Sequence, residues 1–170
     1  MISKKIIRVL LIAIIVFINI GCDQVSKAVV RTSIPEGKTI EVLSDYFVLL
    51  KAENTGAFLG LGDQFTGILG MVFLLGLPLI FLVGMLLYVF LDEKMDHGTV
   101  IAISCIIGGG IANLYDRFIY GSVTDFMHID LGFVRSGIFN AADLSITFGF
   151  LYIIVMGWLV RKVERLEARD

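Results

Sequence analysis

The chain has 170 residues, of which 57% are hydrophobic and only 18% are charged. Soluble domains usually contain about 45–50% apolar and about 25% charged residues, so this chain has too little polar surface to coat one water-soluble core. The net charge of −2 offers no sign of the basic stripe that nucleic-acid-binding proteins carry. We therefore expect an integral membrane protein with no nucleic-acid partner.

Two cysteines and two histidines are present. Cys22 ends the first apolar segment and Cys105 lies within the third, a pattern unlike a disulfide framework. Without a Cys/His cluster, a zinc or iron site is not indicated. We expect neither a metal nor another cofactor.

Four apolar segments approach the roughly 20 residues, with a range of about 17–25, that a membrane-spanning helix needs. They are residues 6–22, 65–91, 98–115 and 144–160. The only charged residue in the first is Arg8, which is close enough to the edge to reach the interface, and the other three contain none. Pro78 is compatible with this reading, since proline is commoner in membrane helices than in soluble ones. We predict an all-α integral membrane protein, a single polytopic domain over residues 1–170.

Basic residues flank the first and last apolar segments, and such residues favour the cytoplasmic side. They are Lys4, Lys5 and Arg8 at the start, and Arg161, Lys162, Arg165 and Arg169 at the end. An even number of spans then puts both termini in the cytoplasm and residues 23–64 and 116–142 outside. Residues 39–51 are rich in Ile, Val, Tyr and Phe and alternate in part, which predicts a small extracytoplasmic β-sheet at the membrane surface.

The N-terminal segment also resembles a lipoprotein signal peptide that ends at Cys22. Against this interpretation, Asn19 stands three residues earlier, where a branched apolar residue is expected. Signal peptides are removed from the mature chain, yet three more apolar segments follow. The first transmembrane helix is the better interpretation, and we expect Cys22 to carry no lipid.

Charged residues gather where the apolar segments end on the outer side. Asp23 and Lys27 are four residues apart, a spacing that more often makes a structural ion pair than a site. Asp116 and Arg117 could form an interfacial salt bridge. Asp125 is harder to explain structurally, because it lies between apolar residues in a short segment that leads back to the membrane.

Asp143 opens the fourth apolar segment, three residues after Asn140. One interpretation is helix capping, since Asn and Asp are good caps and an acid suits the positive helix end. Another is that Asp125 and Asp143 come together and share a proton, so that one acts as a base towards water while the other polarises a carbonyl. Structural ion networks compete with this aspartyl-hydrolase hypothesis.

Two other classes of protein remain as alternatives. A small transporter or channel predicts acids in mid-span and an internal repeat, whereas the last three segments have no charge and no repeat is found. A scaffolding membrane protein leaves the clustering of acids and amides on one side unexplained. Gly108-Gly109-Gly110 lies inside an apolar segment and favours close helix packing over phosphate binding.

Five polar motifs follow one another at or near the outer ends of the predicted spans: Asp23-Gln24-Val25-Ser26-Lys27, Asn54-Thr55-Gly56-Ala57-Phe58, Asn113-Leu114-Tyr115-Asp116-Arg117, Val123-Thr124-Asp125-Phe126 and Phe139-Asn140-Ala141-Ala142-Asp143. Together they resemble the lipoprotein signal peptidase family, also called signal peptidase II, over nearly the whole chain. Two departures are visible: Ala112 stands where the family usually has Gly, and Ala57 is followed by Phe58 instead of a second alanine.

The resemblance implies an aspartic endopeptidase that needs no metal, with Asp125 and Asp143 as its catalytic pair. Its substrates would be prolipoproteins that already carry a diacylglyceryl group, cut just before the lipidated cysteine. Four positions match family residues that line the site and contact the substrate or peptide antibiotics such as globomycin: Asn54, Asn113, Arg117 and Asn140. Two match residues that support the structure and the substrate's lipid: Asp23 and Lys27. The implied location is the bacterial cytoplasmic (inner) membrane, with the site at the outer leaflet.

Overall fold

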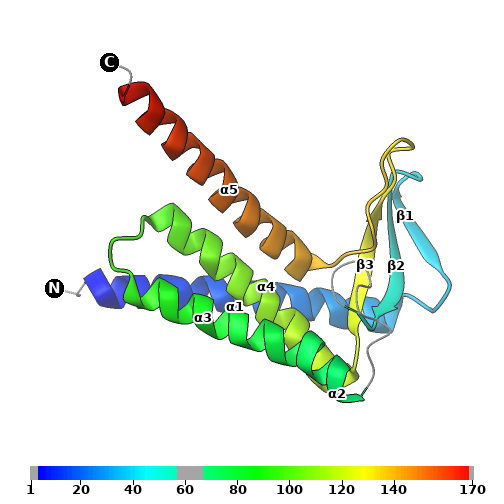
Figure 1. The fold of residues 1–170 in the computed structure, drawn as a ribbon. Helices are drawn as coiled ribbons and strands as arrows, with labels where there is room; N and C mark the ends of the chain where they lie inside the picture. The colour runs from blue at the N-terminus through cyan, green and yellow to red at the C-terminus, as the bar shows by residue number, and fades with distance from the viewer. Residues whose placement is uncertain (1–3, 57–66, 169–170) are drawn as a thin grey trace.

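The computed structural model describes residues 4–56 and 67–168, and Figure 1 shows a helical bundle with a small sheet at one end. The helices are α1 (Lys4–Ser33), α2 (Gly67–Gly70), the π-helix η2 (Met71–Gly76), α3 (Leu77–Leu91), α4 (His97–Tyr120) and α5 (Ala141–Glu167). The strands are β1 (Thr39–Leu43), β2 (Phe47–Asn54) and β3 (Val123–Ile129). Because α2, η2 and α3 run on continuously, the described chain has 4 helices long and apolar enough to cross a membrane.

The predicted fold class is confirmed, and the helices extend past the predicted spans. α1 continues through Cys22 for another eleven residues to Ser33, and α4 ends at Tyr120. Hydropathy misses these extensions because their polar residues face the protein, as Asp23 and Lys27 do with no exposed surface. Residues 65–66 of the second predicted span lie outside the described residues, and the single-domain organisation stays a prediction.

The start of α1, the turn between α3 and α4 and the end of α5 lie at one end of the bundle, opposite the sheet (Figure 1). At this end of the bundle, opposite the sheet, Arg8 Nη2 donates to the carbonyl oxygens of Val89 at 2.8 Å and Asp92 at 2.6 Å. The Val89 carbonyl lies in the last turn of α3, where no intrahelical N–H can reach it, and Asp92 is the C-cap of the helix. Arg8 therefore caps α3 and ties it to α1.

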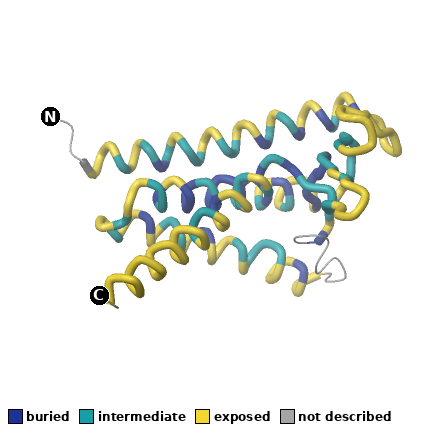
Figure 2. Tube along the Cα trace, turned by 90° about the horizontal axis from the view of Figure 1, so that it is seen from above, coloured by how far each residue is buried: buried dark blue, intermediate teal, exposed yellow. Residues whose placement is uncertain are grey.

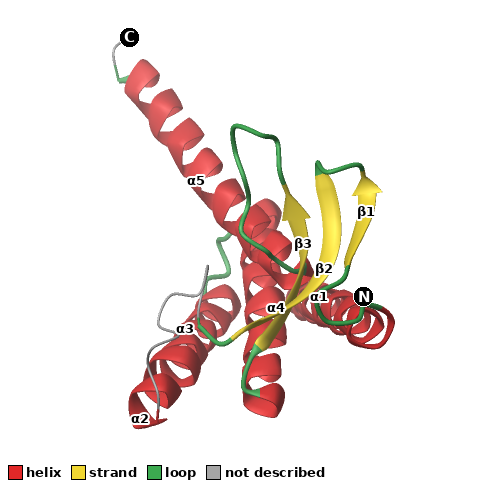
Figure 3. Cartoon of the chain, turned by 90° about the vertical axis from the view of Figure 1, so that its right-hand side faces the viewer, coloured by secondary structure: helices red, strands yellow, loops and turns green. Residues whose placement is uncertain are grey.

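α4 is the central helix of the bundle. In the most hydrophobic stretch of α4, 56% of the helix is buried, compared with 11% or less in the corresponding stretches of the other three spanning helices. Figure 2 shows most of the buried chain there. The remaining helices expose apolar side chains around the outside, as expected where lipid is the solvent. α5 leans away from the others towards its C-terminus (Figures 1 and 3).

Three consecutive glycines let α4 approach three different helices. A Cβ on Gly108 would lie 2.7 Å from the Asn19 Cβ on α1, and one on Gly109 would lie 2.5 Å from the Ala142 carbonyl oxygen on α5. A Cβ on Gly110 would lie 2.5 Å from a side chain of α3. Successive helical residues point about 100° apart, so each glycine faces a different neighbouring helix. The predicted role of the three glycines in close helix packing is therefore correct.

The sheet is antiparallel, with the order β1-β2-β3 (Figure 3). β1 and β2 form where a sheet was predicted for residues 39–51, and β2 continues beyond that region to Asn54. β3 comes from the second predicted outer segment and was not expected as a strand. Gly121 is the C-cap of α4 and has a φ of 76°, which is readily adopted only by glycine, so the chain turns there from the helix into β3.

Candidate active site

Asp125 is on β3 and is 3% exposed. Asn54 on β2 pairs with Val123, two residues before Asp125, so the two side chains are diagonal neighbours on one face of the sheet. Asn54 Nδ2 donates to Asp125 Oδ2 at 3.0 Å. The pairing of β2 with β3 therefore fixes one oxygen of this carboxylate.

Asp143 is in the first turn of α5, where it forms a reciprocal capping box with Asn140. The Asp143 amide donates to Asn140 Oδ1 at 2.9 Å, and the Asn140 amide donates to Asp143 Oδ2 at 3.1 Å. The helix-capping interpretation of Asp143 is thus correct. It leaves the other oxygen, Oδ1, for a different partner.

Backbone pairing brings the start of α5 against β3. The amides of Phe126 and Met127 donate to the Phe139 carbonyl at 3.0 and 2.8 Å, and the Phe139 amide donates back to Met127 at 2.9 Å. The next residue, Asn140, has no exposed surface, and its Nδ2 donates to Asp125 Oδ1 at 2.6 Å. One asparagine therefore contacts both aspartates.

Asn113 on α4 completes the set, since its Nδ2 donates to Asp143 Oδ1 at 2.9 Å. Each of the four carboxylate oxygens accepts a hydrogen bond, three from asparagine side chains and one from a backbone amide. These donors fix the orientation of both carboxylates. The structure thus brings Asn54, Asn113 and Asn140 to the predicted acids as orienting groups.

The environment of Asp125 favours its protonated form. Burial is the largest cause, and together with the charge of Asp143 it raises the pKa of Asp125 from 3.8 to about 6. Hydrogen bonds from Asn54 and Asn140 act in the opposite direction. A carboxyl with a raised pKa keeps its proton to higher pH than usual and can donate it to a substrate carbonyl.

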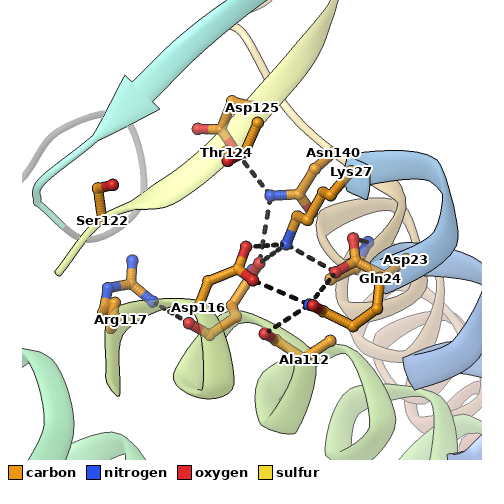
Figure 4. Close-up of polar contacts among 12 residues, drawn as sticks. Asp23, Gln24, Lys27, Ala112, Asp116, Arg117, Ser122, Thr124, Asp125 and Asn140 are labelled. Carbon is orange, nitrogen blue, oxygen red and sulfur yellow. Dashed lines mark hydrogen bonds and ion pairs between the residues drawn. The ribbon is translucent and has the colours of Figure 1, made fainter. Parts of the chain in front are cut away.

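A second buried cluster lies beside this pair, and Figure 4 shows Lys27 pointing at the carboxylates of Asp23 and Asp116. Lys27 Nζ is 2.6 Å from Asp23 Oδ2 and 2.9 Å from Asp116 Oδ2, with no side-chain surface exposed in any of the three. Arg31 Nη2 lies 3.1 Å from Asp116 Oδ1. Two acids and two bases make the cluster neutral, which a buried charged group requires.

Arg117 does not pair with Asp116 in the described part of the chain, so the suggested salt bridge between these neighbours is wrong. Its Nη2 instead donates to the Gly56 carbonyl at 2.7 Å. This bond ties the end of α4 to the chain just after β2, close to Asn54. The rest of that motif, Ala57 and Phe58, lies outside the described residues.

A cavity of about 520 Å³ opens beside the aspartates. Its polar end includes Asn54, Asn113, Arg117, Asp125 and Asp143. Its apolar side is formed by residues of η2, α3 and α5: Leu74, Pro78, Phe81, Leu82, Ile146 and Phe150. Asn140 does not line the cavity, so its predicted contact with the substrate stays a prediction.

Sequence reasoning missed Arg31 and Thr124. Arg31 Nε donates to Thr124 Oγ1 at 2.8 Å, and Thr124 donates to Glu53 at 3.0 Å. Arg31 lies one helical turn after Lys27, a spacing that would have indicated it if the length of α1 had been known. In the described ranges, no group of three His, Cys, Asp or Glu side chains could hold a metal ion; the expected absence of a metal stays a prediction.

The family model for signal peptidase (SPase) II matches residues 14–159. The chain belongs to the signal peptidase II family. It is therefore a membrane peptidase that acts on signal peptides.

Relatives and a solved structure agree with this assignment. The lipoprotein signal peptidase of Staphylococcus haemolyticus is 30% identical over 146 residues, which cover 86% of this chain and 87% of the relative. That of Streptococcus pneumoniae is also 30% identical, with 85% and 90% covered. A solved bacterial membrane enzyme is similar with a TM-score of 0.73 and 28% identity, covering 93% of this chain and 90% of the other.

Proposed function

We propose that this signal peptidase II cleaves diacylglyceryl-modified prolipoproteins just before the lipidated cysteine, with Asp125 and Asp143 as its catalytic pair. The observation that carries the proposal is that Asn140 contacts both carboxyls, and that both aspartates line the polar end of a cavity with an apolar side. Neither acid forms an ion pair within the described residues, unlike Asp23 and Asp116. Both are therefore available for proton transfer.

In the proposed reaction, the ionised aspartate takes a proton from water while the oxygen of that water attacks the scissile carbonyl carbon. The protonated aspartic acid donates its proton to the carbonyl oxygen. The raised pKa of Asp125 suits this residue to that role. The first aspartate then gives its proton to the amide nitrogen while the second takes a proton from a hydroxyl of the diol, so that the C–N bond breaks and both carboxyls return to their starting protonation. No step requires a metal or a thiol.

The apolar side of the cavity supports the proposal that the substrate carries a lipid. Leu74, Phe81 and Phe150 stand between helices that face lipid, next to the polar end with the acids. Acyl chains could remain in an apolar medium there while the peptide bond reaches the carboxyls. Peptide antibiotics such as globomycin would compete for the same cavity.

The test replaces each acid by its isosteric amide. Asp125→Asn and Asp143→Asn should each abolish cleavage of a diacylglyceryl-modified precursor while the protein still inserts and binds globomycin. The double variant should be scarcely worse than either single variant, because the two groups act as one unit. Near-normal cleavage by either single variant would remove that residue from the mechanism.

We further propose that the protein lies in the bacterial inner membrane with both termini in the cytoplasm and the sheet outside. The basic residues at both ends of the chain support this orientation. In a background with Cys22→Ser and Cys105→Ser, Ser44→Cys at the exposed β1–β2 turn should react with an impermeant maleimide in intact cells. Protection of this cysteine until the membrane is permeabilised would reverse the orientation.

A further inference from the structure

Lys27 has three buried acceptors around its ammonium group. Two are the carboxylates of Asp23 and Asp116, and the third is Asn113 Oδ1 at 2.9 Å. An ammonium has three N–H donors and no acceptor, so these contacts use its full capacity. Only the bond to Asn113 leads out of the charged cluster and towards the proposed catalytic pair.

The bond from Lys27 decides which way the Asn113 amide faces. Because a lysine can only donate, the oxygen of the amide must face it, and Nδ2 must then point away. Nδ2 points at Asp143 Oδ1, 2.9 Å away. With the amide reversed, Oδ1 would face a carboxylate oxygen, and an acceptor would oppose an acceptor.

Asn140 also donates to Asn113 Oδ1, but its geometry makes it the weaker constraint. Its Nδ2 is 3.2 Å from Asn113 Oδ1 and 2.6 Å from Asp125 Oδ1. A bond from a charged donor is roughly twice as strong as a neutral one. Lys27 therefore supplies most of the preference for the observed amide orientation.

We propose that Lys27 is a positioning residue for the catalytic pair, acting through the Asn113 amide on Asp143 and by its charge on Asp125. The inference rests on the proposed roles of the two aspartates. It differs from a purely structural role, in which Lys27 would only join α1 to α4. Figure 4 shows the Lys27 ammonium between the carboxylate cluster and Asn140.

The charge effect gives a readout that loss of helix packing would not produce. The positive charge of Lys27 is one of the influences that lower the pKa of Asp125, against the larger upward effect of burial. Two other charged groups act on Asp125: Asp143 on α5 and Arg117 on α4. Arg31 on α1 and Glu53 on β2 instead contact the hydroxyl of the neighbouring Thr124. Lys27 is among the strongest influences on this pKa and Asp23 is not, so removing both charges should still move the pH profile of turnover towards higher pH.

The experiment uses Lys27→Met together with Asp23→Asn, because this pair keeps the buried cluster neutral and leaves Asp116 paired with Arg31. We expect kcat for a lipidated precursor to fall about a hundredfold, the scale of a misplaced catalytic group. KM should stay within about threefold, since Lys27 does not line the cavity, and the kcat profile should shift to higher pH. Globomycin binding would report the folded fraction.

Two comparisons make the result decisive. Arg8→Met removes a half-buried cation at the opposite end of the bundle, and it should lower the unfolding temperature without changing the pH profile. Adding Asn113→Ala to the Lys27 variant should cost little more than Asn113→Ala alone, because the two act in series. A folded Lys27→Met/Asp23→Asn protein with normal kcat and pH profile, or additive losses, would overturn the inference. Activity in Asp125→Asn or Asp143→Asn would instead overturn the proposed function.

Discussion

Gly109→Ala tests whether the contact of α4 with α5 sets the position of Asp143. The added Cβ would lie 2.5 Å from the Ala142 carbonyl oxygen and 2.9 Å from Ile146 Cγ1. The Ile146 side chain can rotate, but a backbone carbonyl inside the first turn of a helix cannot. The first turn of α5, which includes Asp143, must therefore move away from α4.

The displacement follows from the contact distances. Ordinary non-bonded contacts begin at about 3.5 Å, so the carbonyl must retreat by roughly 1 Å. That shift stretches the 2.9 Å bond from Asn113 Nδ2 to Asp143 Oδ1 beyond hydrogen-bonding range. A 1 Å misplacement can cost about a hundredfold in rate, which corresponds to about 2.7 kcal/mol in activation free energy.

The assay is kcat for a diacylglyceryl-modified precursor in detergent or lipid, with the unfolding temperature measured in parallel. Overpacking should cost about 1–3 kcal/mol of stability, so the protein is assayed well below that temperature. Gly84→Ala is the matched control, because its added Cβ meets nothing within 4 Å. If Gly109→Ala retains kcat within about threefold of the parent, α4 contact at this glycine does not position the acid.

Further expectations concern Arg117 and Asp125. Arg117→Ala should raise KM without moving the cleavage point, because Arg117 lines the cavity and its bond to Gly56 is lost. Arg117→Lys should be impaired too, since lysine lacks the planar fork of donors. Unchanged KM in both variants would exclude Arg117 from substrate binding. The raised pKa of Asp125, about 6 against 3.8, means that the folded state holds this proton more tightly than the unfolded chain does. Its contribution of up to about 3 kcal/mol is complete below about pH 4 and lost as the pH rises through about 6. Asp125→Asn should flatten the pH dependence of the unfolding temperature over this range, and an unchanged slope would contradict the assigned pKa.

The membrane class, the four spanning helices and the candidate acids were all predictable from the linear chain. Lipid demands long uncharged runs, and such runs are visible in a linear chain without knowledge of contacts. The family resemblance followed from short polar motifs at the ends of these runs. Asp125 and Asp143 stood out because a carboxylate next to an apolar run is costly unless the fold gives it partners.

The partners of those polar residues depend on how the helices and strands pack in three dimensions. Whether Asp116 pairs with Arg117 or with Lys27 depends on the rotation of α4 against α1, which neighbouring residues in sequence cannot reveal. β3 was missed because its partner, β2, is about seventy residues away, and strand pairing is decided by such distant neighbours. The asparagine bonds to the aspartates likewise join α4, α5 and two strands, and hydrogen-bond geometry depends on ångström-scale packing that no linear pattern encodes.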